Sequence, residues 1–183
     1  MSIIDQSAEF LAKSIRKNYS EAGSETALKY ALSLIINTFI SITISLLFCL
    51  ITGHFIQCVL GIAAFILIRS ITGGMHASSS MSCCIISILI FNTIAFVTFD
   101  YSLYSAVLDA AAIVVFLITT PNNIQNMSSL DPKYYPILKL IAVLMVSSNF
   151  IIQSTMLTAA FCIQAFLTTS PAYRLRDFIE RRC

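Results

Sequence analysis

Apolar residues form long continuous runs along this chain, and short polar breaks separate the runs. Runs approaching about 20 apolar residues are typical of membrane-spanning helices, whereas the strands of a membrane β-barrel alternate apolar and polar positions. The pattern predicts an all-α polytopic membrane protein, with residues 1–183 as a single integral-membrane domain. Six transmembrane helices are predicted, at about residues 27–52, 55–68, 81–99, 103–120, 137–150 and 155–169. The last two are short, and a re-entrant pair of helices would produce the same pattern.

Both ends of the chain are too polar to lie in the bilayer core. Residues 2–20 are predicted to form an amphipathic helix, because apolar residues recur at helical spacing and charged residues fill another face. We expect this helix to lie flat on the membrane surface, with a solvated cap on the helix bundle as the alternative. Residues 173–183 are predicted to form a charged cytoplasmic tail.

The composition agrees with a membrane protein. The 183 residues are 57% hydrophobic and 11% charged, and the mean hydropathy is +0.85. A soluble domain of this length carries many more charged residues on its surface. The net charge of +2 comes from cations that are mostly scattered singly, so nucleic acid is not an expected partner.

Lysine and arginine occur only at alternate connections between the predicted spans. The positive-inside rule therefore places both termini and the stretch 69–80 on the cytoplasmic side of a multi-pass protein of the cell membrane. The three opposite turns carry no lysine or arginine. The cations that follow this pattern are Lys13, Arg16, Lys17, Lys29, Arg69, Lys133, Lys139, Arg174, Arg176, Arg181 and Arg182.

Polar chemistry gathers in one stretch, residues 69–84, between the second and third predicted spans. Polar side chains inside a membrane protein usually mark function. His76 and Cys83 would lie about 10.5 Å apart along an unbroken helix, so a catalytic pair requires the chain to fold back. Gly73 and Gly74 permit such a bend. With Ser80 as N-cap, Cys83 would lie in the first turn of the next helix, where the helix dipole favours a thiolate.

Each of these features also has a structural interpretation. Gly73-Gly74 could form an ordinary turn, and Arg69 could simply obey the positive-inside rule. We expect Cys84 to be a bystander and Cys49, Cys58 and Cys162 to be small apolar fillers, because free cysteine is commonly buried. No paired zinc-site spacing is present, so neither a metal nor another cofactor is expected. Further polar residues fall inside predicted spans: Asn37, Gln57, Asn92, Asp109 and Gln164.

Arg69, the run Gly73-Gly74-Met75-His76-Ala77 and Cys83 resemble the signature of the accessory gene regulator B (AgrB) family. The pattern is an arginine, then Gly-Gly-x-His-Ala, then a cysteine seven residues after the histidine. The resemblance also covers size, six spans, an amphipathic start and a basic end. Cys84 departs from the single cysteine usual at this point.

The resemblance implies a cysteine endopeptidase in which Cys83 is the nucleophile and His76 the base. Arg69, Gly73 and Gly74 would position the substrate or support the active loop. Members mature a quorum-sensing propeptide, AgrD, by removing its charged C-terminal segment through an acyl-thioester and closing a thiolactone or lactone ring. The implied partners are an AgrD-like propeptide, the lipid bilayer and a second copy in a homodimer.

Two other classes of function remain as alternatives. A small transporter or exporter of a signalling peptide would use the Gly-Gly break as a discontinuous-helix binding site, but no pair of related halves is visible. A non-catalytic membrane scaffold is the second. Asp109 is the only acid well inside a predicted span, and a hydrogen bond that stabilises the bundle is favoured over orientation of His76.

Overall fold

The computed structural model describes residues 3–19, 21–77, 79–122 and 131–180, and within them the protein is helical without strands. The predicted all-α class is thus confirmed. A short 3₁₀ turn, Pro132–Tyr134, precedes α6. The helices are α1 (Ile3–Asn18), α2 (Glu25–Ile51), α3 (Phe55–Thr72), α4 (Ser80–Phe96), α5 (Leu103–Thr119), α6 (Tyr135–Ile152), α7 (Thr155–Leu167) and α8 (Ser170–Glu180).

A helix, α2 to α7, lies at each of the six predicted spans. By length and composition, α2, α3 and the segment Pro132–Ile152 can cross a membrane, whereas α4, α5 and α7 are shorter apolar helices. Capping residues set several boundaries. Ser24 accepts a hydrogen bond from the Ala27 amide at the start of α2, and Ser154 does the same for Leu157 in α7.

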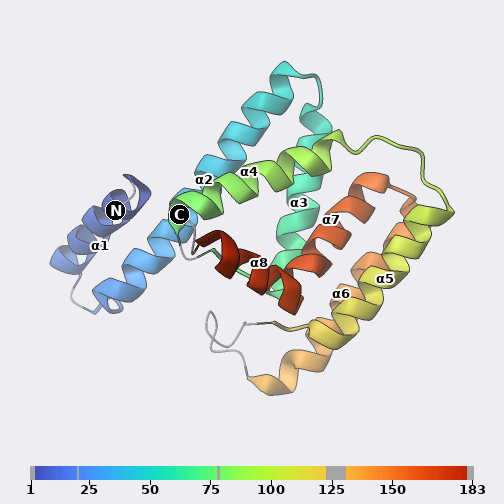
Figure 1. Ribbon diagram of the computed structural model, residues 1–183. Helices are drawn as coiled ribbons and strands as arrows, with labels where there is room; N and C mark the ends of the chain where they lie inside the picture. Colours follow the sequence, from blue (N-terminus) through green and yellow to red (C-terminus); the bar gives the residue numbers. More distant parts are fainter. Residues whose placement is uncertain (1–2, 20, 78, 123–130, 181–183) are drawn as a thin grey trace.

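The helices form two groups joined through α3 (Figure 1). On one side α4 packs against α2 and α3, and on the other α5 packs against α6 and α7, while α3 also contacts α6 and α7. Gly61 lets α3 approach α4 closely, because an added Cβ would lie 2.6 Å from Ile94 Cγ2. This approach holds together the two helices that carry Arg69 and Cys83.

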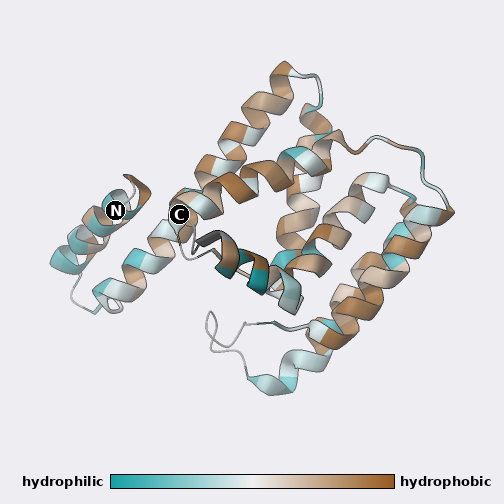
Figure 2. Cartoon of the chain, viewed as in Figure 1, coloured by the Kyte–Doolittle hydropathy of each residue, from teal (hydrophilic) through white to brown (hydrophobic). Residues whose placement is uncertain are grey.

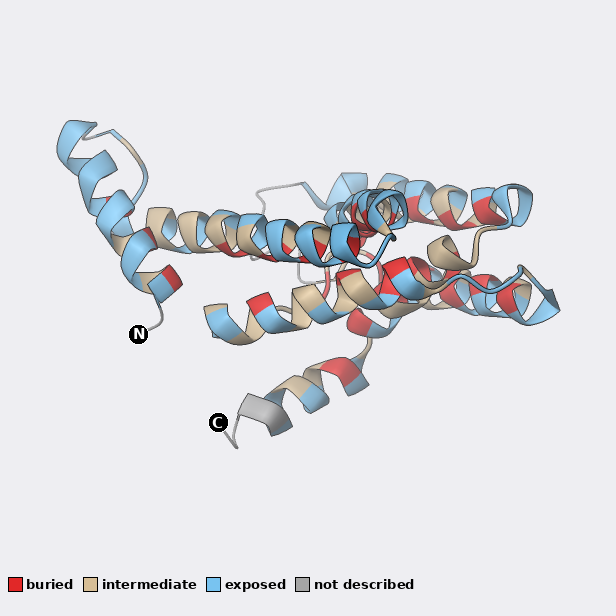
Figure 3. Ribbon diagram, turned by 90° about the horizontal axis from the view of Figure 1, so that it is seen from above, coloured by how far each residue is buried: buried red, intermediate tan, exposed pale blue. Residues whose placement is uncertain are grey.

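The outward faces of the helices are apolar (Figure 2). Large side chains such as Phe39 (70% exposed) and Ile51 (86% exposed) are mostly uncovered by protein. Buried residues instead face the neighbouring helices (Figure 3). Exposed apolar area on this scale is unusual for a soluble monomer and is compatible with a membrane protein.

The predicted N-terminal amphipathic helix is confirmed, and ion pairs are centred on its Glu9. Glu9 accepts hydrogen bonds from Lys13 (2.7 Å) and Lys29 (2.6 Å), and these two cations lower the pKa of Glu9 to about 2. Lys29 therefore ties α1 to α2.

The C-terminal segment is more ordered than expected. The sequence predicted only a charged tail over 173–183, yet its described part continues α8. Arg176 of α8 donates a hydrogen bond to the His76 carbonyl (3.2 Å). The tail therefore folds back onto the central polar stretch.

Candidate functional site

The central polar stretch leaves α3 at Gly73 and turns sharply. Gly73 has φ 69° and Gly74 has φ 128°, which are backbone conformations that favour glycine. An added Cβ on Gly74 would also lie 3.2 Å from the Leu167 carbonyl oxygen. The predicted bend at Gly73-Gly74 is therefore present, and it lies directly before the segment that carries His76.

Main-chain hydrogen bonds fasten this loop to segments far along the sequence. The Gly74 amide donates to the Asn122 carbonyl (3.0 Å), and the Met75 amide donates to the Leu167 carbonyl (2.9 Å). Gln164, fully buried in α7, donates to the Gly73 carbonyl (2.6 Å) and to Thr72 Oγ1 (2.8 Å). The loop is thus held by α7 and by the segment that follows α5.

Arg69, in the last turn of α3, forms hydrogen bonds to the loop that follows it. Its Nη2 donates to the Met75 carbonyl (2.6 Å) and to His76 Nδ1 (3.4 Å), and its Nη1 donates to Gln164 Oε1 (3.3 Å). The guanidinium also lies 6.0 Å from the ring centroid of Phe65. These contacts make Arg69 a support for the loop that carries His76.

The imidazole of His76 is neutral in this environment. Burial and, to a smaller extent, the charge of Arg69 lower the pKa of His76 to about 4. Because a guanidinium can only donate, Nδ1 acts as the acceptor and the ring proton lies on Nε2. A neutral imidazole can take up a proton, which is what a general base requires.

Cys83 lies in the first turn of α4. The N-cap is Ser79 and not the predicted Ser80, so Cys83 is the fourth helical residue where the third was expected. Its amide donates to the Ser79 carbonyl (3.0 Å). Cys84 turns away into the core, where Ser41 Oγ lies 3.3 Å from its sulfur, as expected for a bystander.

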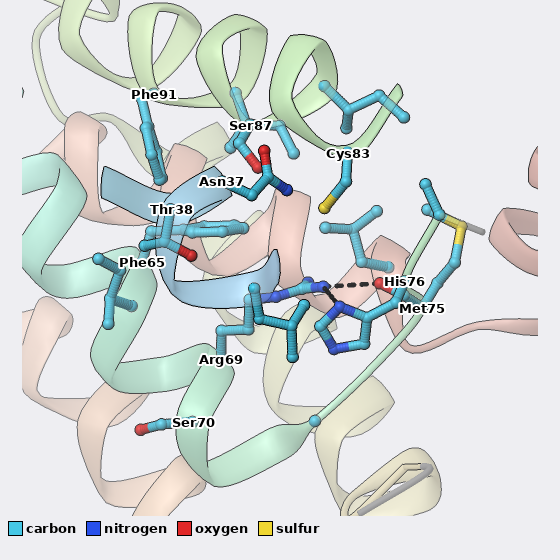
Figure 4. Close-up of a pocket in the computed structure, with 17 residues that line it drawn as sticks. Asn37, Thr38, Phe65, Arg69, Ser70, Met75, His76, Cys83, Ser87 and Phe91 are labelled. Atoms are coloured by element: carbon cyan, nitrogen blue, oxygen red, sulfur yellow. Dashed lines mark hydrogen bonds between the residues drawn. The ribbon is translucent and has the colours of Figure 1, made fainter. Parts of the chain in front are cut away.

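Two cavities, of about 330 Å³ and about 250 Å³, share one wall, and that wall contains both Cys83 and His76. The larger cavity is mostly apolar and also borders Arg69 and Gly73 (Figure 4). The smaller one extends toward α1 and is lined by polar residues, among them Asp5, Lys29, Ser33 and Ser80. In the described part of the chain no hydrogen bond joins Cys83 Sγ to His76, whose ring faces Arg69.

The chain resembles a known protein family over most of its length. The model of the family "Accessory gene regulator B" matches residues 4–172, nearly the whole chain. The chain belongs to the AgrB family. No curated protein and no solved structure matches it. The AgrB family takes part in peptide processing for agr quorum sensing, with an AgrD-type propeptide as substrate.

The match of the AgrB family covers every residue that lines the two cavities, whereas Arg176 of α8 lies beyond it. Sequence reasoning had assigned no role to Gln164, Asn122 or Arg176, although each bonds to the loop or its carbonyls. An amide within an apolar run was the only available signal for Gln164. The 3–19, 21–77, 79–122 and 131–180 ranges hold no group of three His, Cys, Asp or Glu residues suited to ligating a metal ion.

Asp109 lies apart from this site, in the other group of helices. Its Oδ2 accepts hydrogen bonds from Tyr101 (2.9 Å), Asn149 (2.8 Å) and Thr158 (3.2 Å). These bonds join α5, α6 and α7. The expectation that Asp109 stabilises the bundle, in preference to orienting His76, is confirmed by these contacts.

Proposed function

We propose that this AgrB protein is a membrane-embedded cysteine endopeptidase that removes the C-terminal segment of an AgrD-like propeptide and closes the remainder into a ring. One observation carries the proposal: Cys83, at the start of α4, and the neutral His76 line the junction of two cavities. A thiol needs a base to become a nucleophile, and a peptide needs space on both sides of the attacked carbonyl.

In the first step Cys83 Sγ adds to the scissile carbonyl carbon while His76 takes the thiol proton. His76 Nδ1 must give up its contact with Arg69 for this transfer, and at 3.4 Å that is the longest of the three hydrogen bonds of the guanidinium. The proton then passes to the departing nitrogen as the C–N bond breaks. Cys83 is left as an acyl-thioester.

In the second step a thiol or hydroxyl within the substrate attacks the thioester carbon, loses its proton to the imidazole and releases Cys83. Exchange of one thioester for another conserves the activated bond, whereas water would discharge it. The apolar wall of the larger cavity, which includes Phe65, Ile90 and Phe91, suits the acyl portion because it excludes water. The smaller cavity, which Lys29 borders, suits the departing charged segment.

The same proposal includes the membrane topology. Six spans would place both termini, the loop and both cavities at the cytoplasmic face of the cell membrane, as the alternate placement of cations supports. The apolar face of α1 remains open to lipid, with Ile3 75% exposed and Phe10 73% exposed. A homodimer stays a prediction from the family.

Co-expression with the cognate propeptide tests this function. Cys83→Ala and His76→Ala should abolish cleavage while the protein accumulates normally in the membrane, and Cys84→Ala should retain cleavage because Cys84 lines neither cavity. Cleavage by Cys83→Ala would refute the proposal. If variants instead leave cleaved peptide trapped inside the cell, the protein is an exporter.

A further inference from the structure

Attack by Cys83 on a carbonyl creates a negative oxygen, and nearby hydrogen-bond donors must stabilise it. The amide of Cys83 itself is committed to the Ser79 carbonyl (3.0 Å). The terminal nitrogens of Arg69 are committed to Met75, Gln164 and His76. A donor without such a commitment borders the nucleophile on another element, α2.

Asn37 of α2 faces Cys83 across the junction of the two cavities. It lines both cavities, as Cys83 does, and Figure 4 shows its carboxamide directed toward the Cys83 sulfur. The residue is 4% exposed. Its Oδ1 is buried without a hydrogen-bond partner among the described residues. A buried amide with an unused polar atom is costly, so its presence in an apolar helix calls for an explanation.

The neighbouring polar residues on α2 make the contrast clear. Ser41 and Ser45 follow Asn37 at four-residue intervals and are fully buried. Ser41 Oγ donates to the Asn37 carbonyl (2.9 Å), and Ser45 Oγ accepts from Asn92 of α4 (3.3 Å). Among the three residues of this polar stripe, Asn37, Ser41 and Ser45, only Asn37 makes no side-chain hydrogen bond to a described residue. Contacts with α4 explain why Ser41 and Ser45 are polar. They do not explain the amide of Asn37.

We propose that Asn37 is a catalytic residue whose side-chain amide donates a hydrogen bond to the oxyanion that forms on the substrate carbonyl when Cys83 attacks it. The inference rests on the proposed peptidase function. Both steps pass through a tetrahedral intermediate, so the same amide serves cleavage and ring closure. Because Asn37 is held on a packed helix, it offers its dipole without reorganisation, which is where such donors gain most of their effect.

The test uses the purified full-length protein in lipid nanodiscs with a synthetic cognate propeptide. Asn37→Leu, which keeps the volume and removes the donor, should lower kcat about 100-fold to 1,000-fold and leave KM nearly unchanged. Asn37→Asp has the same shape and should lose at least as much, because a carboxylate would repel the oxyanion. The matched control is Ser45→Ala, which removes a buried polar group from the same stripe two turns away.

A second readout separates catalysis from support of the site. Alkylation of Cys83 by iodoacetamide, followed by mass spectrometry, forms no oxyanion. Its rate in Asn37→Leu should therefore stay within about twofold of the parent, far below the loss expected from an oxyanion donor. Asn37→Asp is left out of this readout, because its carboxylate would itself disfavour the Cys83 thiolate. Cleavage by both variants at near the parent rate would overturn the proposal. So would a loss of alkylation that parallels the loss of cleavage. Failure of the peptidase function itself would appear differently, as cleavage by Cys83→Ala.

Discussion

Two buried polar clusters lie in the two groups of helices, and they use their polar atoms differently. In the Asp109 cluster, side chains of α5, α6 and α7 bond to one another through Asp109 Oδ2, and Asp109 is fully buried. In the Arg69 cluster, the charged group bonds to a main-chain carbonyl and an imidazole, and it borders a cavity. The first cluster joins helices. The second supports a loop where a substrate could lie.

The comparison teaches how to separate function from packing inside a membrane protein. Burying an ionisable side chain inside a membrane protein costs free energy, so Asp109 and Arg69 would both be called functional on that ground alone. The partners decide between the two interpretations. An acidic side chain whose partners lie on neighbouring packed helices stabilises the bundle, whereas a guanidinium that orients a loop beside a cavity prepares a site.

The largest expected effect comes from Gly74→Ala in the loop of the Arg69 cluster. A Cβ at φ 128° and 3.2 Å from the Leu167 carbonyl oxygen would displace the loop and His76 with it. Displacement by about 1 Å is expected to slow processing about 100-fold, measured as propeptide cleaved per folded molecule. Gly53→Ala is the control, since φ there is +78° and nothing lies within 4 Å. An equal loss in Gly53→Ala would show that backbone strain alone is responsible.

The next largest effect is expected in the Asp109 cluster, and it should lower the stability of the fold. Asp109→Ala leaves the donors of Asn149 and Thr158 without their shared acceptor, at a cost of about 2 kcal/mol in the free energy of unfolding. Thermal unfolding in detergent measures it. Cleavage per folded molecule should remain near that of the parent. Loss of cleavage without loss of stability would break the comparison between the two clusters.

A matched pair of buried amides sharpens the comparison further. Gln164 and Asn149 are both fully buried, one in each cluster. Gln164→Leu frees the Gly73 carbonyl and one nitrogen of Arg69, and we expect cleavage to slow roughly tenfold, the equivalent of about 1.4 kcal/mol. Asn149→Leu should lower the melting temperature without slowing the folded enzyme. Identical outcomes for the two variants would contradict the distinction.

The smallest effect concerns pH. Below its pKa of about 4 His76 carries a proton and cannot accept another, so kcat/KM should fall as the pH drops through about 4. In Arg69→Gln the pH at which kcat/KM falls should rise, because one cause of the lowered His76 pKa is removed. It should stay below pH 6.5, because burial is the larger cause. The same lowered pKa means that the unfolded chain binds the extra proton between pH 6.5 and 4, so this contribution to stability is lost as the pH falls through that window. If kcat/KM of Arg69→Gln falls at the same pH as that of the parent, the guanidinium does not influence the pKa of His76.

The sequence alone predicted much of the fold because the relevant signals are local. Apolar runs and capping residues marked six helices, and Gly73-Gly74 marked the bend. The family signature brought Arg69, His76 and Cys83 to attention, and the structure indeed gathers them at one cavity. The helix over the basic tail was missed, since charge dominated a pattern whose amphipathic face is short.

Only the tertiary structure decided which residues contact the site residues. Gln164 bonds to Gly73 across 91 positions of the chain, and Arg176 bonds to His76 across 100. Asn37 borders the same two cavities as Cys83 because α2 packs against α4. Helix formation depends on neighbours within a turn or two, which any sequence displays. Hydrogen bonds between helices depend on which faces pack together, and in a chain that is apolar almost throughout, hydrophobic pattern does not select those faces.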